Sequence, residues 1–219
     1  KSIQNYVQAN SKCVARLLYP GFDEKIANEM TKKHEGANRF VCDVSFLCTN
    51  LYSDEKMFPD QRIRRIDLLD AIENDSSIVF HLYGPSFLKE RYPKSYRGFV
   101  EYEVQYEIAR TSRVCLSTHV ISNESDIDYL NERSIIALGC GGLLLTDNQI
   151  NTDCKAFVQM GEDVNATMLI LRQLIALDYI YAEKIRNNAQ SLALSRFTWN
   201  CWAKEVEETY KILSAKADV

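Results

Sequence analysis

Three arginines gather at the start of a predicted helix. Arg62, Arg64 and Arg65 open the amphipathic pattern of residues 61–74, which follows a predicted strand ending at Leu47. A helix N-terminus presents free backbone N–H groups, and guanidinium groups match the geometry of phosphate oxygens. The cluster is therefore a candidate phosphate site, with Arg62 and Arg65 as the candidate ligands. The alternative is a solvent-exposed helix face, which the spacing alone favours.

The three histidines lie in different surroundings. His34, His81 and His119 have no metal-ligand spacing with one another or with the cysteines, so no metal is expected. His81 lies within an apolar run and is predicted to be a core residue. His119 follows a predicted strand at its carboxyl end, where it could contact a ligand. The sequence has neither a nucleophile elbow nor a phosphate-cradling loop ending in Lys-Ser or Lys-Thr, so it names no catalytic residue.

The run Gly-Cys-Gly-Gly at residues 139–142 resembles at first the glycine loop of a methyltransferase or a dinucleotide-binding fold. Such a loop follows a strand and opens a helix. Here a predicted helix runs into the glycines and a predicted strand leaves them. We therefore expect the glycines to cap the helix and to permit close packing of helix on strand. A methyltransferase is the less favoured alternative.

These candidates lie between alternating predicted strands and helices. Short β-branched and apolar runs predict strands at residues 14–19, 41–47, 78–83, 114–117, 143–146 and 156–160. Helical spacing predicts helices at 61–74 (with Asp60 as N-cap), 101–110 and 128–138, and almost throughout the chain from Asp163. The last of these carries Trp199, Trp202, Val206, Tyr210 and Leu213 on one face, which we expect to pack on an apolar surface.

This alternation predicts an α/β fold, a Rossmann-like parallel sheet with helices on both faces and a helical C-terminal tail. Such sheets bind ligands at the carboxyl ends of their strands, where the strand order reverses. We therefore expect the site in the segments 48–60, 84–96, 98–101, 118–131 and 139–142.

Composition limits the class of protein. The 219 residues are 46% hydrophobic and 26% charged, which are globular proportions, and they suffice for one large domain. With 26 basic and 30 acidic residues the net charge is −4, which disfavours a nucleic-acid partner. Seven scattered cysteines without a CxxC pair predict reduced thiols and a cytoplasmic protein. No apolar run is long enough for a membrane span, and no signal peptide opens the chain. Because the first residue is Lys1, we expect further sequence upstream.

The most specific stretch is residues 131–147. It is similar to the signature Asn-x-Arg-x-Phe-Glu-x-x-Ala-Cys-Gly-x-x-Leu-x-Thr-Asp of the C-terminal, nucleotide-sugar-binding domain of two-domain (GT-B) glycosyltransferases. The resemblance is strongest to the group 1 branch that includes the spore-maturation-type (CgeB-like) proteins. Residues 17–23 resemble the interdomain entry of that family, residues 43–47 and 78–84 its first core strands, and 197–199 the start of its terminal helix. Gly98, Phe99 and Val100 resemble the segment that lies against the nucleotide base.

The resemblance implies an interdomain entry segment at residues 1–22 and a donor-nucleotide-binding domain at 23–219. It implies transfer of a sugar from a nucleotide sugar to a glycan, protein or small-molecule acceptor, without a metal or other cofactor. The family's general base, when used, comes from an N-terminal domain that this chain lacks, so residues 1–219 should bind nucleotide weakly and transfer little sugar. The implied nucleotide-sugar-binding residues are Arg62, Arg65, Gly84, Gly98, Phe99, Val100, His119, Asn131 and Arg133.

The chain departs from the family pattern at two positions. Ile136 stands where the family has a glutamate that usually binds the ribose hydroxyls, and Cys48 stands where a glycine is common. Glu124 and Glu132 have the spacing of the paired glutamates of retaining relatives, but their register against Gly141 differs, so the spacing is interpreted as coincidence. The alternative function is a catalytically inactive nucleotide-binding or scaffold domain of the same fold.

Overall fold

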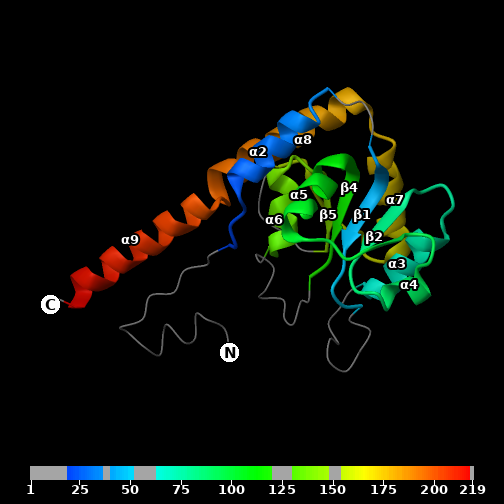
Figure 1. Cartoon of the computed structure of the whole chain (residues 1–219), viewed down its shortest axis with the longest axis horizontal. Helices are drawn as coiled ribbons and strands as arrows, with labels where there is room; N and C mark the ends of the chain where they lie inside the picture. The colour runs from blue at the N-terminus through cyan, green and yellow to red at the C-terminus, as the bar shows by residue number, and fades with distance from the viewer. Residues whose placement is uncertain (1–18, 37–39, 52–62, 120–129, 148–153, 218–219) are drawn as a thin grey trace.

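The computed structural model describes residues 19–36, 40–51, 63–119, 130–147 and 154–217. In these parts of the chain, one six-stranded sheet forms the centre of the molecule (Figure 1). The strands are β1 (Cys42–Leu47), β2 (Phe80–Tyr83), β3 (Tyr96–Gly98), β4 (Ser112–Ser117), β5 (Leu144–Thr146) and β6 (Phe157–Gln159). Their order is β3-β2-β1-β4-β5-β6, and every neighbouring pair is parallel. The predicted Rossmann-like sheet is confirmed, and its order reverses between β1 and β4.

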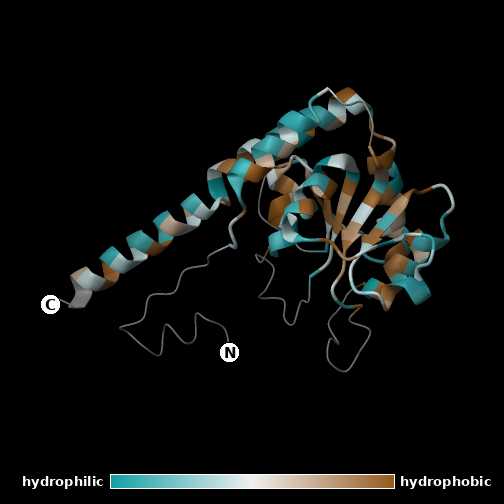
Figure 2. Cartoon of the chain, in the orientation of Figure 1, coloured by the Kyte–Doolittle hydropathy of each residue, from teal (hydrophilic) through white to brown (hydrophobic). Residues whose placement is uncertain are grey.

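Helices cover both faces of the sheet. They are α2 (Glu24–Lys33), α3 (Arg65–Asn74), α4 (Leu88–Arg91), α5 (Tyr102–Thr111), α6 (Glu132–Gly139), α7 (Val164–Ile175), α8 (Tyr179–Arg196) and α9 (Trp199–Ala217). On one face, α3 and α7 pack together over β4 and its neighbours, and on the other α5 and α6 lie on the sheet beneath α2 and α8. Two apolar clusters result, one on each face, and Figure 2 shows the hydrophobic strands between the more polar outer surfaces of the helices.

The central strands are apolar because both of their faces are covered. Val44 and Phe46 of β1 project toward α3 and α7, whereas Cys115 of β4 projects toward α5 and α6. This burial fixes the register of the strands and places their carboxyl ends at one edge of the sheet.

The predicted element boundaries differ from the structure in several places. Helix α3 begins at Arg65, later than the predicted residue 61, because Ile63 is buried and Arg64 has extended dihedral angles. The predicted N-cap, Asp60, lies outside the described residues, as do residues 14–18 of the first predicted strand. The sequence did not predict helices α2 and α4 or strand β3. The segment of β3 was expected to be a loop, but it forms a strand because it pairs with the edge of β2.

The glycine run ends α6, as predicted. Gly141 has a φ of 68°, and the amide of Gly142 donates to the carbonyl of Ala137 at 2.7 Å. This connection enters β5 at its amino end, so it lies at the sheet edge opposite the carboxyl ends of the strands. The expectation that residues 139–142 belong to the ligand site is therefore wrong, because a connection from helix to strand cannot reach that edge.

Helix α9 extends beyond the sheet (Figure 1), and its aromatic face is not buried among the described residues. Trp199 is 46% exposed and Tyr210 is 70% exposed, so the expectation that this face packs on an apolar surface is wrong for the part of the chain that the structure describes. The segment before α2 contacts the start of α9, where the amide of Phe22 donates to the carbonyl of Phe197 at 3.0 Å. The boundary at residue 22 stays a prediction. None of the described helices is long and apolar enough to cross a membrane.

Candidate functional site

The sequence-predicted site residues lie along the carboxyl edge of the sheet. Gly84 follows β2, Gly98 ends β3, and His119 follows β4. Arg65 is the first residue of α3, and Arg133 lies in the first turn of α6. The structure thus brings together residues that are far apart in the sequence, while Arg62 lies outside the described residues.

Arg65 is buried at this edge and joins the ends of β1 and β4. Only 1% of the residue is exposed. Its Nη1 donates to the carbonyl of Asn50 at 2.5 Å, its Nε to the hydroxyl of Thr118 at 2.5 Å, and its Nη2 to the carbonyl of Thr118 at 3.0 Å. The guanidinium therefore holds the two loops that flank the crevice at the reversal of strand order.

Arg133 reaches the same place from α6. Its Nη1 donates to the carbonyl of Leu47, the last residue of β1, at 2.6 Å. The guanidinium carbons of Arg65 and Arg133 lie 5.5 and 6.0 Å from the centre of the Phe46 ring. Two positive charges thus meet over one aromatic ring, beside the N-termini of α3 and α6. Such an arrangement favours a bound anion, since helix N-termini carry a partial positive charge.

Three strand ends are tied together by close backbone contacts. Gly84 has a φ of 154°, and its amide donates to the carbonyl of Gly98 at 2.9 Å. A Cβ at residue 84 would lie 2.0 Å from the carbonyl oxygen of Cys48, so the approach of these two backbones requires glycine. Burial raises the pKa of the Cys48 thiol, although the nearby charges of Arg65 and Arg133 act in the opposite direction.

The N-terminus of α6 is capped from within the protein. The side-chain oxygen of Asn131 accepts the amide of Ser134 at 2.9 Å, and its Nδ2 donates to the hydroxyl of Ser117 at 3.1 Å. The sequence left open whether Asn131 caps the helix or binds a ligand, and in this structure it caps the helix. Its role toward a ligand stays a prediction.

His119 is almost completely buried and connects three elements. Its Nδ1 lies 2.8 Å from a carboxylate oxygen of Asp147, and its Nε2 accepts the amide of Asn131 at 3.2 Å. This pattern corresponds to the neutral ring with its proton on Nδ1. Nε2 therefore positions the start of α6, and Nδ1 joins the ring to the residue that follows β5. The predicted contact of His119 with a ligand stays a prediction.

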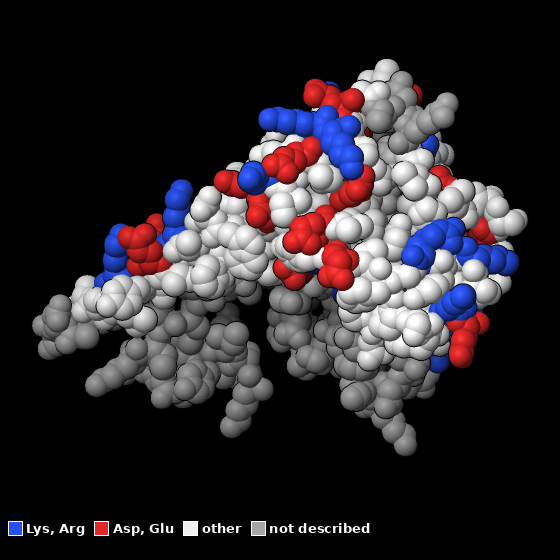
Figure 3. Space-filling view, viewed as in Figure 1, with Lys and Arg blue, Asp and Glu red and all other residues white. Residues whose placement is uncertain are grey.

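An exposed aromatic residue completes the edge. Phe99 follows β3 and is 70% exposed, and Val100 beside it is half-buried. A flat apolar ring at a strand end can stack on a nucleobase, whatever its identity. On the face shown in Figure 3, basic and acidic side chains alternate in small groups and form no continuous basic surface.

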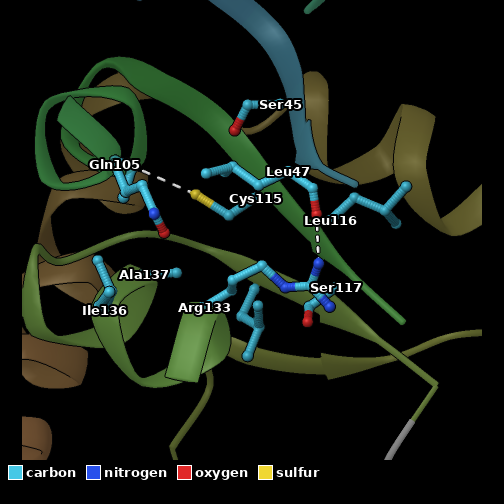
Figure 4. A pocket seen from close by; sticks show the side chains of 11 residues that line it. Ser45, Leu47, Gln105, Cys115, Leu116, Ser117, Arg133, Ile136 and Ala137 are labelled. Atoms are coloured by element: carbon cyan, nitrogen blue, oxygen red, sulfur yellow. Dashed lines mark hydrogen bonds between the residues drawn. The ribbon is translucent and has the colours of Figure 1, made fainter. Parts of the chain in front are cut away.

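A small cavity lies behind Arg133, between β1 and β4 on one side and α5 and α6 on the other (Figure 4). It includes Ile136, which the resemblance aligned with a glutamate, and Ile136 is 1% exposed. Among the described residues, no group of three or more histidine, cysteine, aspartate or glutamate side chains could hold a metal ion. The expectation that no metal is needed stays a prediction.

Comparison with known proteins assigns this architecture to a family. The family described as Glycosyl transferase-like matches residues 64–208, which include both arginines and the whole of α6. The chain belongs to this glycosyl transferase-like family. A sequence comparison with curated proteins gave no significant match.

Solved glycosyltransferase structures share the fold. A sucrose-phosphate synthase from Thermosynechococcus elongatus is 17% identical with a TM-score of 0.63, and the match covers 97% of this chain and 56% of that one. A glycosyltransferase from Rickettsia africae is 13% identical with a TM-score of 0.61, covering 96% and 61%. Anabaena Alr3699/HepE, solved with UDP-glucose, is 16% identical with a TM-score of 0.59, covering 90% and 57%. The chain therefore spans little more than half the length of these structures.

Sequence reasoning missed several residues that build the site. Phe46 carries no signal beyond its place in an apolar strand, and Thr118 is a single hydroxyl residue next to His119. Asp147 closes the signature stretch, but its bond to His119 depends on β4 and β5 being neighbours. Strand order is the information that a single sequence does not supply.

Proposed function

We propose that the chain is the donor-binding half of a GT-B glycosyltransferase, which transfers a sugar from a nucleotide sugar to an acceptor. The observation that supports it best is the convergence of Arg65 and Arg133 on Phe46, beside the N-terminus of α6 and at the reversal of strand order. Relatives in fold include a protein solved with UDP-glucose, which agrees with a nucleotide-sugar donor.

In this proposal the donor's diphosphate lies at the N-terminus of α6, next to Arg133. Negative charge develops on the diphosphate as the sugar departs, and prearranged donors and positive charges stabilise it. Arg65 is too buried to move freely, so it holds the loops while Arg133 faces the ligand. Phe99 would stack on the base, and Gly98, where a Cβ would meet no atom within 4 Å, would allow its close approach. Gly84 would act by bringing the ends of β1 and β2 together beside the ligand.

The acceptor site and any general base would belong to an N-terminal domain outside this chain. The chain spans 56–61% of two of the structures most similar to it, which leaves room in those proteins for a second domain. A place in the CgeB-like branch and a cytoplasmic location are further parts of the proposal.

Calorimetric titration of residues 1–219 with UDP, ADP, GDP and their glucose derivatives tests the proposal. We expect weak but saturable binding of at least one nucleotide, and little transfer of sugar to water or to added glycans. Absence of binding across all six compounds would contradict the proposal and favour a scaffold domain. Efficient sugar transfer by residues 1–219 would contradict the assignment of the acceptor site to another domain.

A further inference from the structure

The cavity behind Arg133 has room for one small group. Its volume for water-sized groups is about 20 Å³, which corresponds to roughly one water molecule or one hydroxyl group. Ser45 of β1 and Cys115 of β4 line it from the sheet, and Gln105 of α5 and Ile136 of α6 line it from the helices. Figure 4 shows Gln105 extending from α5 toward Cys115 and Ala137.

One buried polar group in this cavity lacks a hydrogen-bond partner within the part of the chain that the structure describes. It is the hydroxyl of Ser45, a residue that is 1% exposed. The thiol of Cys115 lies beside it and donates to the carbonyl of Ala109 at 3.5 Å. A second polar group, the side-chain amide of Gln105, lines the cavity from a partly exposed residue. Buried polar groups are normally paired, so the unpaired Ser45 hydroxyl beside this space points to a bound polar group.

The chemistry of the lining defines that group. Ile136 and Ala137 make the α6 wall apolar, and Ala109 continues this wall on α5. Arg133 is the charged residue in the lining, and its guanidinium already donates to the carbonyl of Leu47, so a neutral polar group suits the rest of the cavity. A carboxamide both donates and accepts hydrogen bonds, as does a serine hydroxyl, and a hydroxyl group of a ligand matches both.

The cavity is continuous with the proposed diphosphate position. Arg133 lines the cavity and donates to Leu47 at the carboxyl end of β1. Gln105 and Arg133 are only partly buried, whereas Ser45 is 1% exposed. A nucleotide sugar seated at the N-terminus of α6 could therefore extend a hydroxyl group past Arg133 toward Gln105.

We propose that Gln105 is a specificity-determining residue that binds a hydroxyl group of the nucleotide sugar, with Ser45 completing the site. This inference rests on the proposed function. It explains how an apolar residue can occupy position 136: the hydroxyl group is bound by a neutral amide from α5 and not by a carboxylate from α6. The hydroxyl group comes either from the ribose or from the transferred sugar, and the two sources are separable by experiment.

The test compares the full chain with Gln105→Leu, which keeps the size of the side chain and removes its polar atoms. Gln190→Leu is the matched control, because Gln190 bonds to Thr31 and lies outside the site. Affinities are measured by calorimetry for whichever of UDP, ADP and GDP binds best, for its 2′-deoxy and 3′-deoxy forms, and for its glucose derivative. Melting temperatures of the apo proteins verify that all variants are folded.

If the ribose supplies the hydroxyl, one deoxy nucleotide should bind the wild-type protein at least fivefold more weakly than its parent. Gln105→Leu should then bind the parent about equally weakly and lose this discrimination. If the sugar supplies it, Gln105→Leu should weaken binding of the glucose derivative at least fivefold and leave the nucleotide unchanged.

Equal affinities of Gln105→Leu and wild type for all compounds would overturn the inference, and would mean that the cavity holds only water. Failure of the wild-type protein to bind any nucleotide would instead refute the proposed function, and this inference with it. Gln190→Leu should match the wild type in every titration. If it weakened binding as much as Gln105→Leu, the effect would be unspecific and the inference would be wrong.

Discussion

Replacing Arg133 with alanine removes a guanidinium that the structure places between a protein contact and the proposed ligand. Within the apo protein, the side chain donates to the carbonyl of Leu47 at 2.6 Å and lies 6.0 Å from the centre of the Phe46 ring. One charge-assisted bond and one weak cation–π contact of a half-buried residue contribute about 1–2 kcal/mol to the free energy of unfolding. For a domain of this size, the melting temperature should fall by roughly 2–8 °C.

The effect on nucleotide affinity should be larger if Arg133 contacts the diphosphate. A charge-assisted bond to phosphate contributes about 1.5–3 kcal/mol, so Arg133→Ala should weaken nucleotide binding roughly 10- to 150-fold. Calorimetric titration measures the affinity, and thermal unfolding of the apo protein measures the stability. The two effects have different causes and need not scale with each other.

Arg113 provides a matched control. It also donates to a backbone carbonyl, that of Ile175 at 2.5 Å, and lies 5.0 Å from the centre of an aromatic ring, that of Phe40. It belongs to β4 near the amino ends of the strands, at the opposite edge from the site. Arg113 also pairs with Asp43 at 3.8 Å, so Arg113→Ala should lower the melting temperature by at least as much and leave nucleotide affinity unchanged. A change in affinity of less than about twofold for Arg133→Ala, roughly 0.4 kcal/mol, would refute the assignment of Arg133 to the diphosphate.

Three further changes test the architecture of the site and of the fold around it. Gly84→Ala should reduce the free energy of unfolding, measured by urea titration, by more than about 2 kcal/mol, because the new Cβ meets the carbonyl of Cys48. An unchanged free energy of unfolding would show that the ends of β1 and β2 do not approach each other this closely. Arg65→Met should cost about 2–4 kcal/mol in the same assay, since it leaves the buried carbonyl of Thr118 and the partly buried bond to the carbonyl of Asn50 without their donor. A neutral effect would contradict its structural role. Hydrogen bonds from Ser77 and Arg172 lower the pKa of Asp75 from its ordinary value of 3.8 to about 2. The ionised Asp75 contributes fully to stability above about pH 4, and this contribution is lost as the pH falls toward 2. Asp75→Asn should therefore destabilise the protein at pH 7, by less than about 1 kcal/mol, and should not destabilise it at pH 2. Equal losses of stability at both pH values would contradict this prediction.

The sequence predicted the fold because the central strands are apolar on both faces. Runs such as 114–117 and 143–146 have no polar alternation, and this is the pattern of strands covered by helices on both sides. Strand β3 was missed because it has only three residues and lies at the sheet edge. The aromatic face of α9 was misjudged because periodicity shows that a face is apolar but not what covers it.

The site was predicted less completely than the fold. The rule that ligands bind at the carboxyl ends of parallel strands placed Arg65, His119 and Arg133 at one edge, and the structure confirms their positions. It did not show that Arg65 and His119 are buried, because their partners Thr118 and Asp147 come from other parts of the chain. The sequence pattern did not single out Gln105, because its proposed role depends on the cavity that α5 and α6 form with the sheet.

Hydrogen–deuterium exchange with and without a nucleotide sugar tests the central claim most directly, because it reports where the ligand binds. With a saturating concentration of the best-binding nucleotide sugar, we predict slower exchange of backbone amides in residues 130–136, at the N-terminus of α6, and in residues 63–68, at the start of α3. The amides of residues 139–143, at the opposite edge of the sheet, should be unchanged. Protection confined to that opposite edge, or no protection at α6 despite measurable binding, would contradict the proposal that the carboxyl edge of this sheet binds the sugar donor.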